Sequence, residues 1–163
     1  MPVRNEKSRI RRRLGLLAGL TAMVAAGGAV VAAPASAGPN CASGYHCVFY
    51  STIDSARHSY FNSDSNFSGD TFNQSSGQAG YGAAVDNNVW SASNSSTGGY
   101  ESHYYDGANY SGFLFCVNPG DYIASTASNG GNTSTTNGSG LTSGLRQRAS
   151  SLQLRGTTSI DCW

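Results

Sequence analysis

The stretch YYDGANYSGFLFCVNPGDY, residues 104–122, decides the fold class of this chain. It combines aromatic residues and glycines with one cysteine and one proline, and it contains no lysine or arginine. Aromatic residues favour strands, whereas glycine and the Asn-Pro-Gly sequence favour turns. The stretch therefore predicts two β-strands around a folded corner, and it raises the question of whether that corner also contacts another molecule.

Short runs rich in aromatic and β-branched residues recur along the chain, with turn residues between them. No long segment after residue 37 keeps apolar residues at helical spacing, and around Leu152 and Leu154 apolar and polar residues alternate, as in a strand with one buried face. We therefore predict an all-β sandwich or barrel. The expected strands are residues 46–52, 59–61, 85–91, 101–105, 112–117 and 150–154.

The first 37 residues have the organisation of a secretory signal peptide. Six basic residues precede an apolar run over 14–33, and Ala35-Ser36-Ala37 places small residues where signal peptidase cleaves. The alternative is a membrane anchor, but glycines and Pro34 dilute the run. We expect cleavage after Ala37 and a secreted, extracellular protein that does not bind membranes. Arg11-Arg12-Arg13 leaves both Sec and twin-arginine export open.

Removal of the signal changes the net charge of the chain from positive to negative. The full sequence has 10 Lys and Arg against 9 Asp and Glu. Six of those bases and one of those acids lie in residues 1–37, which leaves four arginines against eight acids and a net charge near −4. Nucleic acid and anionic membranes become unfavourable partners, because phosphate binding relies on clustered Lys and Arg.

The four cysteines all lie in the exported part, residues 38–163, where oxidising conditions favour disulfides. Four cysteines allow three pairings. We favour Cys41 with Cys47, which closes a short N-terminal loop, and Cys116 with Cys162, which ties the end of the chain to a central strand. A chain of this length is enough for one domain with one core.

The exported part looks like one domain of two unequal halves, about residues 41–98 and 99–163. Each half holds an aromatic strand beside a cysteine and later reaches a Ser-containing strand. Residues 125–144 are nearly all Ser, Thr, Asn and Gly, and we expect a flexible surface loop there.

Tyr105, Tyr110 and Gly112 follow the spacing aromatic, four residues, aromatic, one residue, glycine. This spacing resembles the Greek-key signature of βγ-crystallin-like domains, and the resemblance implies a disulfide-stapled Greek-key sandwich. The aromatic residues would pack across a folded hairpin, and the glycine would take a backbone conformation that a side chain opposes. A serine on a later strand closes this signature, and Ser150 is the candidate, with Ser151 as the alternative.

The order of these motifs, with Cys41–Cys47 before them and residues 115–120 after the hairpin, resembles that of peptidase inhibitor family I36, secreted proteins of actinobacteria. The resemblance implies a monomeric inhibitor that blocks the active site of an extracellular protease, expected to be a metalloprotease, through a braced loop and without a cofactor. The loop residues that it implies are Phe115, Cys116, Val117, Asn118 and Pro119, with Phe115 and Val117 suited to an apolar specificity pocket.

The alternative function is a secreted carbohydrate- or cell-wall-binding module, which could be antimicrobial, without inhibitory activity. Tyrosine rings stack on sugar rings, while Asn and Ser hydrogen-bond the sugar hydroxyls. Several tyrosines on one exposed face would favour sugar binding, and a projecting loop at Cys116 would favour inhibition. The candidate residues are Tyr45, Tyr60, Tyr81, Tyr100 and Tyr104.

Calcium binding is a further hypothesis, because many βγ-crystallin-like domains bind this ion through a short Asp/Asn- and Ser-containing motif. Asn87, Asn88 and Ser91 fit that motif, and oxygen ligands suit a hard cation. In the second half, the corresponding segment is taken to start at Arg146, whose positive charge opposes a divalent ion.

Catalysis is not expected from this sequence. It has no Gly-x-Ser-x-Gly elbow, no His-Glu-x-x-His pair and no phosphate-binding loop. Its histidines, His46, His58 and His103, are scattered. We expect His58 and His103 to be exposed residues beside turns.

Overall fold

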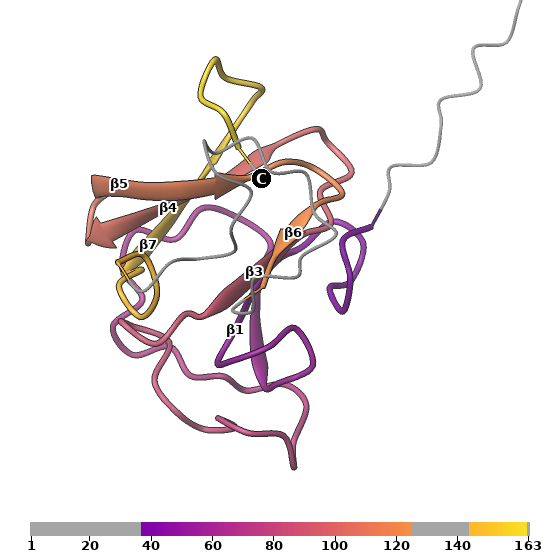
Figure 1. The fold of residues 1–163 in the computed structure, drawn as a ribbon, viewed down its shortest axis with the longest axis vertical. Coiled ribbons are helices and arrows are strands. Elements are labelled where there is room, and N and C mark those ends of the chain that lie inside the picture. Colours follow the sequence, from indigo (N-terminus) through magenta and orange to yellow (C-terminus); the bar gives the residue numbers. More distant parts are fainter. Residues whose placement is uncertain (1–36, 125–143, 163) are drawn as a thin grey trace, which may run out of the picture. The chain divides into compact units, whose positions relative to one another are not determined.

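The computed structural model describes residues 37–124 and 144–162, and it confirms the prediction of an all-β chain, since this part contains strands and no helix. One antiparallel sheet has the order β2-β1-β3-β6 and the other the order β5-β4-β7 (Figure 1). The first sheet consists of β1 (His46–Phe49), β2 (Arg57–Tyr60), β3 (Ser91–Asn94) and β6 (Tyr122–Ile123). The second consists of β4 (Glu101–Gly107), β5 (Ser111–Val117) and β7 (Ser151–Arg155).

The predicted signal peptide and the predicted flexible loop fall outside the described residues, apart from Ala37 and Gly144 at their ends. In the residues that are described, no helix has the length and the apolar character needed to cross a membrane.

The strand predicted over residues 85–91 begins only at its last residue, Ser91. The chain turns before that point, because the amide of Asn88 donates to the carbonyl of Val85 and Asn87 has a left-handed φ of 56°. The short strand β6 was not predicted, since two residues give too little periodicity to detect.

The strand pairing of β1 with β3 in the first sheet has the same register as the pairing of β4 with β7 in the second sheet. Phe49 lies opposite Ser91 between β1 and β3, and Tyr105 lies opposite Ser151 between β4 and β7. The backbone contacts outside the strands repeat as well. The amide of Asn87 donates to the carbonyl of Ala149, and the amide of Gln147 donates to the carbonyl of Val89. The two halves of the chain are therefore structurally equivalent, with position 87 matching 147 and position 91 matching 151.

Each half also lends one segment to the sheet of the other half. Ile123 of β6 pairs with Ala92 of β3, and Asp64, between β2 and β3, forms an isolated bridge with Leu152 of β7. Ala92 and Leu152 occupy equivalent positions in the repeated register. This exchange ties the halves into one domain with a shared core.

The core is rich in aromatic side chains that come from both sheets. Tyr104 and Phe115 stack with their ring centroids 4.7 Å apart, and Tyr60 and Phe67 stack at 4.9 Å. Offset-stacked rings of this kind add to the free energy gained from area burial. Smaller apolar residues complete the same cluster, among them Val48, Ala92, Val117, Ile123 and Leu152.

The β4–β5 hairpin has the folded conformation that its motif predicts. Gly112 has a φ of 70°, and the rings of Tyr105 and Tyr110 meet edge to face at 5.9 Å. The serine that closes the hairpin is Ser151, whose hydroxyl donates to the carbonyl of Gly107 at 2.7 Å and accepts from the amide of Tyr110 at 3.3 Å. The choice of Ser150 was therefore wrong by one residue, because neighbouring side chains on a strand face opposite sides.

The disulfides join Cys41 to Cys47 and Cys116 to Cys162, which is the favoured pairing. Two disulfides fit an extracellular protein. The first closes a loop at the start of β1, and the second holds the last described residue against β5.

Candidate functional site

The loop that the family resemblance implied for protease contact is largely inside the protein. Phe115, Cys116 and Val117 all belong to β5 and are 1%, 0% and 0% exposed. Phe115 and Val117 belong to the core cluster, and Cys116 bonds Cys162. The assignment of these three residues as contact residues is thus wrong, because β5 continues through Val117 and buries them.

Of the predicted protease-contact segment, only the turn that follows β5 reaches the surface. The amide of Asp121 donates to the carbonyl of Asn118, Pro119 is exposed, and Gly120 has a φ of 85°. These features form a tight turn in which proline and glycine take their preferred positions. The side chain of Asn118 donates to the carbonyl of Cys162 at 3.0 Å, which fastens the turn to the C-terminal segment.

The candidate tyrosines divide into two groups. Tyr60 and Tyr104 are buried in the core, so their proposed role in sugar stacking is wrong. Tyr45, Tyr81 and Tyr100 are exposed. Tyr100 lines a pocket of about 360 Å³, and Tyr45 packs edge to face against Phe61 of the same pocket at 5.5 Å.

This cavity, called the aromatic pocket below, is built by segments far apart in sequence. They are the loop before β1, the first residue of β1, the segment after β2, the connection between β3 and β4, and β7. Its lining residues are Gly44, His46, Phe61, Asn62, Ser63, Ser96, Thr97, Gly98, Tyr100 and Leu154.

The aromatic walls of the pocket are unusually open to solvent. Phe61 is 63% exposed and Tyr100 is 49% exposed. Large apolar side chains at such exposure gain little from folding, and a cluster of them around a cavity is typical of a binding site. No local pattern in the sequence marks Phe61 as a binding residue, because a lone aromatic residue at the end of a strand is an ordinary core candidate.

Side-chain hydrogen bonds hold the pocket walls in place. Asn94 donates to the carbonyl of Tyr100 at 2.8 Å and accepts from the amide of Ser96 at 2.9 Å. The hydroxyl of Ser96 accepts from the amide of Tyr100 at 3.0 Å. On the opposite wall, Ser63 accepts from the amide of Leu154 at 2.9 Å. The cavity is therefore preorganised, which lowers the entropy cost of binding a ligand.

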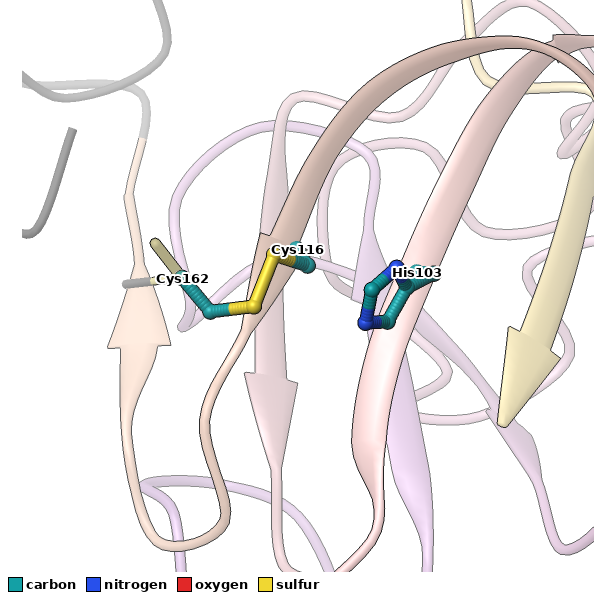
Figure 2. Close-up of side chains that lie close together, drawn as sticks. All are labelled: His103, Cys116 and Cys162. Atoms are coloured by element: carbon teal, nitrogen blue, oxygen red, sulfur yellow. A yellow bond between two sulfur atoms is a disulfide. The ribbon is translucent and has the colours of Figure 1, made fainter. Parts of the chain in front are cut away.

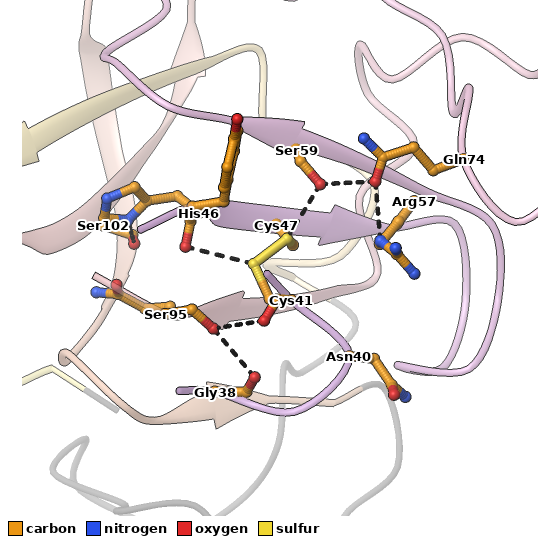
Figure 3. Close-up of a disulfide and its surroundings, with 12 residues drawn as sticks. Gly38, Asn40, Cys41, His46, Cys47, Arg57, Ser59, Gln74, Ser95 and Ser102 are labelled. Carbon is orange, nitrogen blue, oxygen red and sulfur yellow. Dashed lines mark hydrogen bonds between the residues drawn. A yellow bond between two sulfur atoms is a disulfide. The ribbon is translucent and has the colours of Figure 1, made fainter. Parts of the chain in front are cut away.

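The loop closed by the Cys41–Cys47 disulfide, which Figure 3 shows, contributes Gly44 to the lining of the pocket. The amide of Gly44 donates to the carbonyl of Ser95 at 2.7 Å, while the Ser95 hydroxyl donates to the carbonyls of Gly38 and Cys41. Gly44 lines the pocket and Tyr45 braces Phe61, so the disulfide helps to fix the aromatic wall.

Apart from Tyr100, His46 is the one titratable side chain among the pocket-lining residues, and it is only 2% exposed. Its Nδ1 lies 2.6 Å from the Ser102 hydroxyl, a contact that Figure 3 shows. Burial lowers the pKa of His46 from 6.5 to about 4. The imidazole is therefore uncharged at neutral pH, and the lining of the pocket carries no formal charge.

The buried imidazole makes the stability depend on pH. Because its folded pKa lies below its unfolded value, the stabilisation is complete above pH 6.5 and is lost as the pH falls towards 4. The expected loss over this range is about 3 kcal/mol. His103, whose pKa burial also lowers, acts in the same direction. Urea titrations at pH 7, 5 and 4 measure the loss, and His46→Gln should remove the part of the dependence that comes from His46; an unchanged pH profile would contradict this assignment.

His103 is buried in β4, which corrects the expectation that it is exposed beside a turn. Its Nε2 lies 2.7 Å from the Glu101 carboxylate, which also accepts from the amide and the hydroxyl of Thr158. Burial works to raise the pKa of Glu101, but these hydrogen bonds outweigh it and hold that pKa below its ordinary value. The cluster anchors the C-terminal segment to β4.

His103 also faces the second disulfide (Figure 2). One ring nitrogen of His103 and the sulfurs of Cys116 and Cys162 lie within 4.8 Å of one another. Metal ions bind thiolates, and these two sulfurs are bonded to each other. In the oxidised protein, His103 and the Cys116–Cys162 disulfide therefore have a structural role.

Two of the three calcium candidates donate hydrogen bonds to backbone carbonyls. The hydroxyl of Ser91 donates to the carbonyl of Ser51, and the side chain of Asn88 donates to the carbonyl of Asp86. The structural equivalence also corrects the segment compared with them, because Asn87 matches Gln147 and not Arg146. Calcium binding through Asn87, Asn88 and Ser91 stays a prediction.

Comparisons with protein-family models, with curated proteins and with solved structures found no match.

Proposed function

We propose that the protein is a secreted carbohydrate-binding module and that the aromatic pocket binds a sugar ring. The observation that carries this proposal is the exposure of Phe61 and Tyr100 around a cavity with polar side chains beside them. A sugar ring has an apolar face that packs on an aromatic ring and an edge of hydroxyls that needs hydrogen-bonding partners. Asn62, Ser63 and Thr97 supply such partners at the rim.

The fold that we propose for this module is the βγ-crystallin-like Greek-key sandwich. The equivalent registers of the two halves, their exchanged segments at Asp64 and Ile123, and the hairpin closed by Ser151 support it. The signal-like sequence before Gly38 and the two disulfides support secretion.

Peptidase inhibition is the second candidate, and one observation favours it. The Cys41–Cys47 loop has its own disulfide, and Ala42, Ser43 and Tyr45 are exposed on it. A rigid exposed loop binds a protease at low entropy cost. Titration of the secreted protein against a thermolysin-like and a subtilisin-like protease tests this candidate; saturable inhibition that Tyr45→Ala weakens would support it, and full residual activity would eliminate it.

Replacing either aromatic side chain of the pocket should weaken sugar binding strongly without unfolding the protein. We expect Phe61→Ala and Tyr100→Ala each to weaken binding to insoluble chitin or cellulose by about tenfold or more, because each loses a stacking surface. Both side chains are exposed, so thermal midpoints should change little. Pull-down isotherms measure the binding.

Tyr81→Ala is the matched control for these variants. Tyr81 is 52% exposed but does not line the pocket. Its replacement should leave binding unchanged. Equal losses for Tyr81→Ala and Phe61→Ala would show that binding, if present, is not located in the pocket.

A further inference from the structure

The pocket holds one buried polar atom whose hydrogen-bonding capacity is unused. His46 Nδ1 is turned to Ser102, and no hydrogen bond of the described chain involves the other ring nitrogen, Nε2. Nε2 is not among the fully buried polar atoms that lack a partner, and His46 is a lining residue of the pocket. Because no group of the described chain hydrogen-bonds Nε2, this nitrogen is the natural hydrogen-bonding point for a ligand in the pocket.

We infer that the aromatic pocket takes an uncharged saccharide and that His46 selects it by a hydrogen bond between Nε2 and a sugar hydroxyl. This inference rests on the proposed function and deepens it. It makes His46 a specificity-determining residue in addition to the stacking residues Phe61 and Tyr100.

The type of ligand group follows from the chemistry of a neutral imidazole. If Nδ1 accepts from the Ser102 hydroxyl, Nε2 carries the proton and donates; if Nδ1 donates, Nε2 accepts. A hydroxyl group both donates and accepts, so it fits either tautomer. A carboxylate or a sulfate only accepts, and an ammonium group only donates.

The electrostatics of the lining also disfavours a charged ligand. The lining residues include no Asp, Glu, Lys or Arg. A charged sugar would lose hydration in this cavity without gaining an opposite charge there, which is unfavourable. Uncharged rings lose only hydroxyl hydration, which the rim side chains and His46 can replace.

The test uses the secreted form of the full chain on an array of uncharged, carboxylated and sulfated oligosaccharides, followed by calorimetry. Methyl-esterified oligogalacturonate and its free acid serve as a pair that shares one sugar backbone and differs in the charge of the carboxyl group, apart from the small ester methyl. Binding should be confined to uncharged sugars. His46→Leu should weaken it by about tenfold, because one buried hydrogen bond is lost, whereas His46→Gln, which keeps an amide nitrogen near the position of Nε2, should retain most of it.

A second measurement avoids dependence on the folding of a buried variant. In wild-type protein labelled with ¹⁵N-histidine, the Nε2 resonance of His46 should shift when the best uncharged sugar of the array is added, and that of His103 should not. Pocket-dependent binding of carboxylated or sulfated sugars, or an unshifted His46 resonance, would overturn this inference and leave the proposed function standing. Absence of all sugar binding, or binding that Phe61→Ala does not weaken, would overturn both.

Discussion

Val117→Asp should unfold the protein. Val117 is 0% exposed and belongs to the core cluster with Phe115 and Tyr104. The described members of this cluster are hydrophobic residues, and an uncompensated buried charge costs roughly 3 to 5 kcal/mol. Since a domain of this size has a total stability of about 5 to 15 kcal/mol, we expect a secreted product without the near-UV circular dichroism of packed aromatic rings.

Pro119→Ala is the control for this variant. It changes the exposed turn two residues later and should alter the stability by less than about 1 kcal/mol. If Val117→Asp instead folds with nearly wild-type stability, Val117 is not part of the core. The residues at the end of β5 would then again be candidates for contact with a protease.

Loss of the Cys116–Cys162 disulfide should be the next largest effect. This bond closes a loop with a sequence separation of 46, whereas Cys41 and Cys47 are separated by 6. In the chain-entropy model, the paired Cys→Ser replacements should cost about 4 kcal/mol for the long loop and about 2 kcal/mol for the short loop. Urea titrations of the two double variants measure the difference.

The structure adds a reason for this order of effects. Besides the long disulfide, the Glu101–Thr158 contacts and the Asn118 hydrogen bond hold the C-terminal segment against the sheet, and these are weaker links than a covalent bond. The two double variants serve as controls for each other. Equal stabilities would contradict the loop-length argument, and a larger loss for the short loop would reverse it.

The short disulfide is expected to matter more for the pocket than for stability. It fixes the loop that carries Gly44 and Tyr45, so its loss should release the support of Phe61. Loss of the short disulfide should therefore act mainly on sugar binding, whereas loss of the long disulfide should act mainly on the free energy of unfolding.

Much of the fold was predictable because its signals are local. Tyr105, Tyr110 and Gly112 specify the hairpin within a few residues, and four cysteines leave few pairings. The misplacement at Ser150 was a register error of one residue. A one-residue shift exchanges the two faces of a strand, and local sequence alone constrains it weakly.

The candidate site was much less predictable. The pocket combines residues from five segments that only the sheet pairing brings together, and Phe61 and His46 carry no spacing signal. The prediction of a contact loop at Phe115 was wrong for a related reason. An aromatic–cysteine–valine run is compatible both with an exposed loop and with the end of a buried strand, and only tertiary packing distinguishes the two.

The most direct test of sugar binding in the pocket is a titration of ¹⁵N-labelled residues 38–163 with an uncharged oligosaccharide, followed residue by residue by NMR. We predict saturable shifts confined to the aromatic pocket, at Gly44, His46, Phe61 and Tyr100. No shifts with any uncharged sugar of the array, or shifts confined to the Asn118–Asp121 turn, would contradict this prediction.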